Sequence, residues 1–270
     1  MKQIAVALSV YKNVLPEELT ACLESIYLQS MQADLFVKVD GEVPEELWNM
    51  LKQDYDSGKI AYLDYRKKNL GIARSFNELF KIILERGYPY IARMDSDDIM
   101  VLQRLKKQYN FMENHPDIDV VGGYIEEIGE EIAYKKTVMY PLQHHEMFVF
   151  FSKRVPMANV TTFFRKSFFG KAGLYPTESP TNEDTLFWMN GFAAGCRFAN
   201  IPEVLVDVRI SKDFFGRRGG WQKAWSDFRD RVKVIRTLRY NKSAYLYAMG
   251  IFFVNISPAF MKFFLYKRLR

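Results

Sequence analysis

The sequence predicts an α/β fold, in which helices cover both faces of a mostly parallel sheet. Apolar runs of strand length alternate along the chain with helical patterns of about 10 to 15 residues, which is typical of parallel sheets. Polar residues follow these runs directly, as they do where ligands bind beyond the carboxyl ends of parallel strands. Of the 270 residues, 49% are hydrophobic and 16% aromatic, which is enough for one large core.

The first half of the chain contains the clearest alternation. Four apolar runs predict strands at residues 4–10, 35–40, 60–65 and 88–94. Apolar residues at helical spacing predict helices between them, at residues 16–29, 44–56 and 72–86. The first of these helices begins with Pro16 and two acidic residues, which suit the positive end of a helix.

Beyond residue 100 the patterns are shorter. They predict a helix at 103–114 and strands at 120–124 and 158–165. Asn182-Glu183-Asp184 then leads into a helical pattern at 185–194. A second group of carboxylates therefore stands at the start of a predicted helix.

The composition of the chain changes near residue 210. Residues 1–210 contain the alternating strands and helices, whereas the chain from Arg209 onward has fifteen basic and three acidic residues. This tail also contains apolar, aromatic stretches at 244–257 and 258–266, each shorter than the roughly 20 residues that cross a bilayer. We expect residues 211–270 to be a basic, amphipathic helical region that lies on an anionic membrane surface.

Charge and cysteine usage narrow the class of protein. A formal charge of +6 and a pI near 9.1 indicate an anionic partner, but no nucleic-acid-binding signature is present, so no nucleic acid is expected. Cys22 and Cys196 stand far apart, which predicts neither disulfides nor a zinc site. His144 and His145 lack a third ligand at useful spacing. The first apolar run is too short for a signal peptide, and we expect a cytoplasmic protein.

The acidic segment Asp95-Ser96-Asp97-Asp98 directly follows the fourth predicted strand. Its three carboxylates repel one another unless a cation or several donors offset them. Mg²⁺ and Mn²⁺ prefer carboxylate oxygens, and Asp95 and Asp97, two residues apart in an extended segment, point to the same side. The segment predicts either a site for a metal-bound phosphate or, more simply, a solvated acidic turn.

Other polar residues also follow predicted strands. Tyr11, Asp40, Arg66 and Asn69 come at or just after strand ends, so we expect them in one crevice with the acidic segment. Asp40 could accept a hydrogen bond from a base N–H or could cap the turn at Gly41. Arg66 and Asn69 could bind a ligand, or could belong to a basic turn and an ordinary loop.

Two later segments also allow two interpretations. Glu183 and Asp184 could act as a general base near the crevice, or could cap their helix and complement its dipole. Arg217 and Arg218, which two glycines follow, could close over a diphosphate leaving group because arginine forks match phosphate oxygens. The alternative for this pair is a surface charge run.

Five short segments occur in a characteristic order. They are Ser9-Val10-Tyr11-Lys12-Asn13, Val39-Asp40-Gly41, Asn69-Leu70-Gly71-Ile72-Ala73, Met94-Asp95-Ser96-Asp97-Asp98 and Asn182-Glu183-Asp184. With this set, the chain resembles family 2 glycosyltransferases of the GT-A fold over about residues 3–210. The likeness is greatest to the bacterial enzymes of amylovoran, capsule and O-antigen synthesis. Glu42-Val43 departs from the family pattern, which commonly has a second Asp before the Gly and a Ser after it.

The resemblance implies a UDP-sugar donor. Tyr11 and Asp40 would hold the uracil and ribose, with Arg66 and Asn69 nearby helping to hold the nucleotide. The exact contact with the base is open, because of the departure after Gly41.

The resemblance also implies a metal site and a catalytic base. Asp97 would be the ligand of Mn²⁺ or Mg²⁺, with Asp95 as its companion on the nucleotide sugar. Asp184 would deprotonate the acceptor hydroxyl, and Glu183 would orient acceptor or donor sugar. Direct displacement would then invert the anomeric carbon.

The expected reaction moves a hexose or N-acetylhexosamine, with galactose or glucose preferred, from UDP to a lipid-diphosphate-linked oligosaccharide at the inner face of the membrane. The chain lacks a QxxRW motif and long spanning helices, which argues against a processive synthase. A sugar nucleotidyltransferase is an alternative, although the Gly-rich, Arg-containing loop of that class is absent after the first strand. A non-catalytic, basic membrane-binding module is another.

Overall fold

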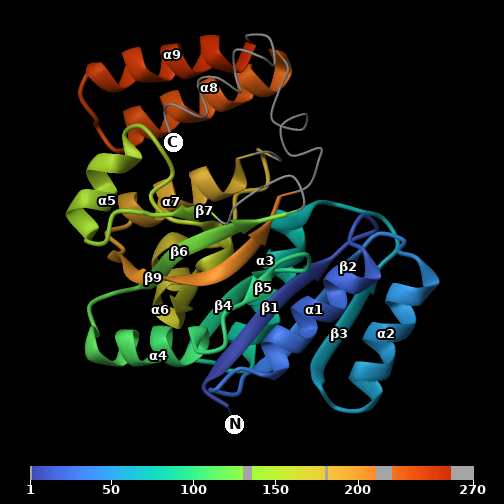
Figure 1. The fold of residues 1–270 in the computed structure, drawn as a ribbon. Helices are drawn as coiled ribbons and strands as arrows, with labels where there is room; N and C mark the ends of the chain where they lie inside the picture. Colours follow the sequence, from blue (N-terminus) through green and yellow to red (C-terminus); the bar gives the residue numbers. More distant parts are fainter. Residues whose placement is uncertain (1, 130–135, 180–181, 211–220, 257–270) are drawn as a thin grey trace.

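The computed structural model describes residues 2–129, 136–179, 182–210 and 221–256. Within these residues the strands form one mixed sheet with helices on both faces (Figure 1). The strands are β1 (Ile4–Val10), β2 (Asp34–Asp40), β3 (Ile60–Arg66), β4 (Tyr90–Asp95), β5 (Ile99–Met100), β6 (Val120–Ile128), β7 (Lys136–Val138), β8 (Phe163–Arg165) and β9 (Phe198–Arg209). The helices are α1 (Pro16–Tyr27), α2 (Glu45–Asp56), α3 (Ile72–Glu85), α4 (Arg104–Asn114), α5 (His144–Phe151), the 3₁₀ turn η1 (Asn159–Thr161), α6 (Lys166–Ala172), α7 (Glu183–Ala193), α8 (Trp221–Thr237) and α9 (Ser243–Ile256).

The strand order is β3-β2-β1-β4-β8-β6-β9-β5, with β7 paired to β6. The first four strands of this order are parallel, as the alternation predicts. Beyond β4 the sheet is mixed, because β8 pairs antiparallel with β4 and β6 while β9 runs parallel to β6. The α/β class with a helical C-terminal region is confirmed.

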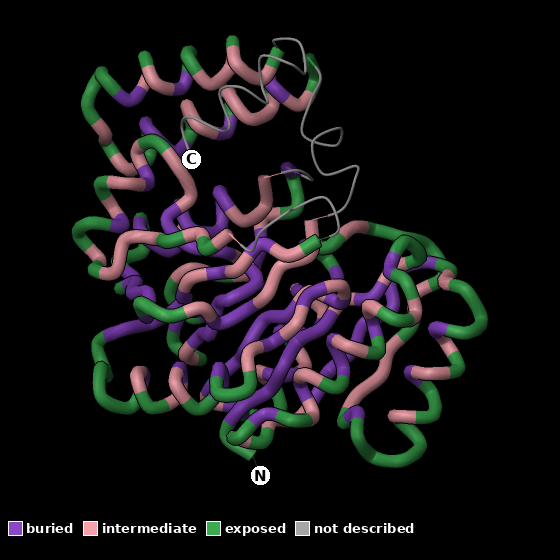
Figure 2. The backbone as a smooth tube through the Cα atoms, in the orientation of Figure 1, coloured by how far each residue is buried: buried purple, intermediate pink, exposed green. Residues whose placement is uncertain are grey.

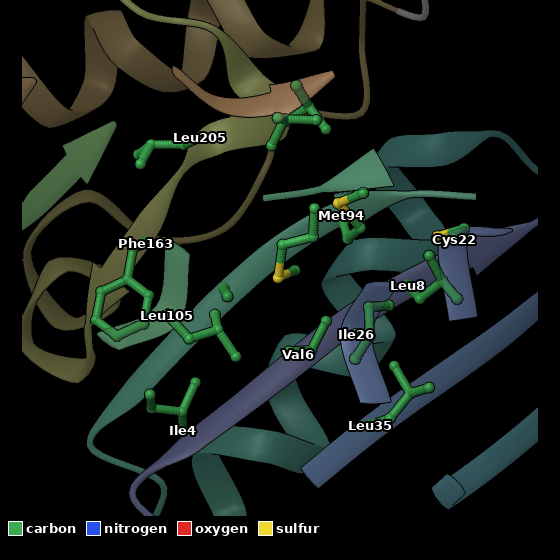
Figure 3. Packing of buried hydrophobic residues seen from close by; sticks show 14 of the residues in the cluster. Ile4, Val6, Leu8, Cys22, Ile26, Leu35, Met94, Leu105, Phe163 and Leu205 are labelled. Atoms are coloured by element: carbon green, nitrogen blue, oxygen red, sulfur yellow. The ribbon is translucent and has the colours of Figure 1, made fainter. Parts of the chain in front are cut away.

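The core forms two layers, one on each face of the sheet. Alternate side chains of a strand point to opposite faces, so Ile4, Val6 and Leu8 pack with α1, α2 and α4, while Ala5 and Ala7 face the layer that contains α3 and α7. Figure 3 shows the first layer, with side chains of β1 next to those of α1. The central strands are almost wholly buried (Figure 2), which explains why they are continuous apolar runs in the sequence.

The C-terminal helices α8 and α9 pack against each other and lie beside α7 and α5 at one end of the molecule (Figure 1). Val234 of α8 joins the core layer of α3 and α7. Ile235, Ala244 and Ala248 form a small cluster between the two helices. No helix in the described part of the chain has the length and apolarity to cross a membrane.

The predicted elements of the first 128 residues match the observed ones closely, but the strand predicted at 158–165 is wrong over its first half. Thr161 donates its N–H and its hydroxyl to the carbonyl of Ala158, at 3.0 and 2.8 Å, which closes the 3₁₀ turn. Local bonds of this kind compete with a strand ladder. The stretch predicted at 244–257 forms α9, whereas the stretch at 258–266 lies outside the described residues.

Candidate functional site

The carboxyl ends of the central parallel strands lie at the same edge of the sheet. β1 lies between β2 and β4, with Val10 opposite Val39 and Ser9 opposite Asp95. Tyr11 is the residue after β1, so it stands between the ends of the two neighbouring strands. The structure therefore brings the strand-end residues together as the parallel arrangement predicts.

Asp40, at the end of β2, is the centre of one group of hydrogen bonds. Its carboxylate is 3% exposed and accepts the Arg66 guanidinium at 2.5 and 3.1 Å. The same carboxylate accepts the N–H groups of Leu70 and Gly71, at 3.0 and 2.9 Å. Asn69 donates its side-chain amide to the Asp40 carbonyl at 3.0 Å. Asp40, Arg66 and Asn69 thus form one rigid unit, which also means that Asp40 orders the loop before α3.

Gly41 lets this loop approach β2 closely. Its φ of +94° lies in the region that favours glycine, and an added Cβ would lie 3.0 Å from the Cβ and 3.2 Å from the N of Asn69. A glycine at this position therefore fits the close contact between the β2 turn and the 69–71 loop.

Arg93 and Asp95, both on β4, form a two-pronged ion pair. Nη1 and Nη2 of Arg93 lie 3.0 and 2.8 Å from the two carboxylate oxygens of Asp95. The Arg93 guanidinium is buried and lies 4.6 Å from the centre of the Phe76 ring. Burial opposes its charge, but the surrounding negative groups, Asp95 foremost, offset this effect and raise the pKa of Arg93.

The acidic segment is not a solvated turn. Ser96 and Asp98 are 4% and 3% exposed, and Asp98 accepts the N–H of Arg209 at 2.9 Å. Burial, followed by the charges of Asp97 and Asp95, raises the pKa of Asp98 well above its ordinary value. Asp98 is therefore a buried link to β9, while Asp95 and Asp97 are half-buried at the strand ends.

Glu183 and Asp184 occupy the first turn of α7, where the sequence predicts them. Burial and then the Asp184 charge raise the pKa of Glu183 to about 7, with smaller effects of Arg93, which lowers it, and Asp95, which raises it. Asp184 accepts the N–H of Thr185 at 2.6 Å, which is a contact of the capping kind. The second pair of carboxylates is thus within electrostatic reach of the Arg93–Asp95 ion pair, although the two are about 90 residues apart in sequence.

Helix α8 forms hydrogen bonds with the segment that precedes Glu183 and Asp184. Asp230 is 3% exposed and accepts the Ser179 hydroxyl at 2.5 Å and the Asn182 amide at 3.0 Å. Neither Asp230 nor Arg93 was predicted from the sequence as a site residue. Asp230 is one of only three acidic residues in the basic tail, which is the signal that could have drawn attention to it.

The described residues contain no cluster of three or more His, Cys, Asp or Glu side chains that could bind a metal alone. Asp95 and Asp97 suit a cation of another kind, one that takes one or two carboxylates and completes its coordination with phosphate oxygens and water. The Arg93 contacts use one lone pair on each Asp95 oxygen, so further coordination remains open. Arg217 and Arg218 lie outside the described residues.

Comparisons with known proteins give a family match and several relatives. Residues 6–173 match the family described as glycosyl transferase family 2. The amylovoran biosynthesis glycosyltransferase AmsE of Erwinia amylovora is 32% identical over 219 residues, which are 80% of each chain. The UDP-Gal:alpha-D-GlcNAc-diphosphoundecaprenol beta-1,3-galactosyltransferase of Escherichia coli is 25% identical over 272 residues, covering 98% of this chain and 96% of that one.

A solved structure shows the same fold. The mannosyltransferase PcManGT from Pyrobaculum calidifontis, in complex with GDP-Man and Mn²⁺, aligns with a TM-score of 0.64 at 14% identity. The alignment covers 92% of this chain and 73% of that one.

Proposed function

Since the chain belongs to glycosyl transferase family 2 and is a glycosyltransferase of polysaccharide biosynthesis, we propose that it is a metal-dependent, inverting enzyme that uses a UDP-sugar. The sugar it moves is a hexose or N-acetylhexosamine, with galactose or glucose preferred. The acceptor is an oligosaccharide linked to a lipid diphosphate. One observation supports the proposal: in the parallel register of β1 with β2 and β4, Asp40 and the Asp95 segment end at the same edge of the sheet.

The uridine of the donor binds where β1, β2 and β3 end. Tyr11 and Asp40 hold the uracil and ribose, and Arg66 and Asn69 support them through the hydrogen bonds that fix Asp40. A relative along almost the whole chain is named for a UDP-Gal donor and a diphosphoundecaprenol-linked acceptor, which favours the same substrate classes here.

Asp97, with Asp95 as its companion, would hold Mn²⁺ or Mg²⁺ beside the donor diphosphate. A cation bound there would offset the charge of the departing UDP. Arg93 fixes the orientation of Asp95 through both carboxylate oxygens, so this side chain does not have to be ordered when the donor arrives.

Asp184 removes the proton from the acceptor hydroxyl, and Glu183 orients the sugars. The acceptor oxygen forms a bond to the anomeric carbon as the bond from that carbon to UDP breaks. The proton passes to the Asp184 carboxylate. A single displacement of this kind inverts the anomeric carbon, so an α-linked UDP-sugar gives a β-linked product.

The α8–α9 region attaches the enzyme to the inner face of the cell membrane. Trp221 and Trp225, one helical turn apart on α8, are 64% and 53% exposed. Leu246, Met249 and Phe253 recur at helical spacing on α9 and are 66%, 43% and 63% exposed. Exposed apolar side chains in a basic segment suit the headgroup zone of an anionic membrane. The division into a catalytic domain, residues 1–210, and a membrane region, residues 211–270, follows from this proposal.

Membership of this family argues against the two alternatives, a nucleotidyltransferase and a non-catalytic membrane-binding module. Titration calorimetry of UDP with the purified protein tests the donor site. We expect binding in the presence of Mn²⁺, loss of binding in EDTA, and loss in Asp97→Ala under both conditions. Equal affinity of the wild type with and without Mn²⁺ would contradict the metal site, and no binding of UDP in either condition would contradict the donor site.

A further inference from the structure

A cavity of about 180 Å³ lies between α7, α8 and α9, next to the catalytic carboxylates. Asn182 and Thr185, which flank Glu183 and Asp184 in the sequence, both line it. The cavity is much larger than the roughly 15 Å³ that one water needs. It is therefore large enough for a polar group of several atoms beside the proposed base.

Two acidic side chains of the cavity are already bonded within the protein. Asp230 accepts the Ser179 hydroxyl and the Asn182 amide and lies 3.5 Å from Nε of Arg229. Asp227 pairs with Lys223 at 3.0 Å and accepts the Asn255 amide at 3.4 Å. The negative charge on the cavity wall is thus offset by donors of the chain itself.

Two basic side chains that line the cavity, Arg231 and Lys153, form no ion pair among the described residues. Arg231 donates one N–H to the Phe151 carbonyl at 2.7 Å and lies over the Phe151 ring, but forms no ion pair with any described carboxylate. Burial lowers its pKa, as expected of a guanidinium shielded from water. Lys153, an exposed residue, lines the same cavity. The charges of Asp184 and Asp227 act on Arg231 from a longer range, but the guanidinium N–H groups that do not contact Phe151 can donate to an anionic group in the cavity.

The remaining wall is apolar and leads towards the helices proposed to lie on the membrane. Phe228, Ile251 and Phe252 line the cavity from α8 and α9. The Phe252 ring contacts Trp221 and Trp225, both exposed on α8. A ligand at this position would meet cations beside α7 and apolar side chains beside the membrane helices.

We propose that this cavity binds the diphosphate of a lipid-linked acceptor through Arg231 and Lys153, with the lipid leaving along α8 and α9. The inference rests on the proposed function and names the site that receives its second substrate. Arg231 acts as a binding residue for the acceptor, separate from the strand-end site of the donor. Charge-assisted hydrogen bonds to phosphate oxygens supply the affinity.

Calorimetry with farnesyl diphosphate tests the site directly. EDTA keeps the probe from binding the Asp95–Asp97 site through a metal, and farnesol and inorganic pyrophosphate separate the contributions of lipid and charge. Arg231→Gln should weaken farnesyl diphosphate binding about tenfold or more, and Lys153→Gln should weaken it less. Arg236→Gln, the same change at an exposed position of α8, should leave it unchanged.

Arg231→Lys and thermal unfolding separate binding from folding, because the lysine keeps the charge and should retain part of the affinity. Unaltered binding in Arg231→Gln, or no binding of farnesyl diphosphate to the wild type, would overturn the inference. Loss of binding in Asp97→Ala would overturn it too, since the probe would then occupy the donor site.

Kinetics distinguish this inference from the proposed function. With a sugar diphosphate lipid as acceptor, Arg231→Gln should raise the acceptor KM and leave the donor KM unchanged. If the wild type transfers no sugar but binds farnesyl diphosphate through Arg231, the proposed function fails and the diphosphate site stands. If transfer occurs with an unchanged acceptor KM in Arg231→Gln, the inference fails and the function stands.

Discussion

Both oxygens of Asp95 are held by the buried guanidinium of Arg93, at 2.8 and 3.0 Å. The Arg93 charge also acts on Glu183 at the start of α7, where it lowers the pKa against the larger raising effects of burial and Asp184. The charge of one buried cation therefore acts both on the proposed metal site and on Glu183, the neighbour of the proposed base. Its removal should affect both stability and catalysis.

Arg93→Met is expected to destabilise the protein by about 3 to 5 kcal/mol, since a partly buried Asp95 would lose its partner. Arg197→Met is the control, because Arg197 pairs with Asp117 where both side chains are more than half exposed. This variant should lose less than about 1 kcal/mol of its free energy of unfolding. Denaturant unfolding measures both. The double variant Arg93→Met/Asp95→Asn should lose less free energy of unfolding than the two single variants together. Full additivity of the two losses would show that the pair is not coupled.

The sequence could predict the central part of the site because the signals there are local. Tyr11, Asp40 and Asp95 follow apolar runs, and parallel strands align such ends at one edge. The role of Asp230 could not be predicted, because its contacts with Ser179 and Asn182 join segments about 50 residues apart. The strand β9 was not predicted either, because Pro202 and Glu203 interrupt its apolar pattern. Short and irregular elements depend on tertiary contacts that no local pattern shows.

Glu183→Gln is expected to stabilise the metal-free protein at pH 8 and to have a much smaller effect at pH 5. Burial and Asp184 raise the pKa of Glu183 from 4.5 to about 7, so the folded protein holds this proton more tightly than the unfolded chain. Stability is lost as the pH rises from 4.5 to 7, and above 7 the penalty reaches about 3 kcal/mol. Glutamine has no charge to bury. Thermal unfolding in EDTA at both pH values measures the difference, and an equal effect at pH 5 and pH 8 would contradict the explanation.

Gly41→Ala is expected to weaken UDP binding and to lower stability by about 1 to 3 kcal/mol. The new Cβ would press on Asn69 and move the 69–71 loop away from Asp40. Gly58→Ala is a matched control, because Gly58 also has a positive φ, +79°, but its Cβ would meet nothing within 4 Å. That control should lose stability through strain alone and keep its affinity for UDP. Equal calorimetric affinities for UDP in both variants would show that the loop does not support the nucleotide.

Replacing Trp221 and Trp225 together by Ala is expected to reduce binding to vesicles that contain phosphatidylglycerol, because the pair supplies exposed aromatic surface on α8. Leu28→Ala is the control, since Leu28 is 68% exposed at the end of α1, outside the α8–α9 pair. Co-sedimentation at low and high salt measures binding, and salt should weaken it in every variant. Retention of full binding by the double variant would place membrane attachment elsewhere.

The anomeric configuration of the product tests the proposed function most directly. The wild-type enzyme is incubated with Mn²⁺, a GlcNAc-diphosphate-lipid acceptor and, in turn, UDP-galactose, UDP-glucose and UDP-N-acetylglucosamine, and the product is analysed by NMR. We expect release of UDP and a β-linked sugar from one of these α-linked donors, with a transfer rate about 10²- to 10⁴-fold lower in Asp184→Asn. An α-linked product, or undiminished transfer by Asp184→Asn, would contradict the proposed function.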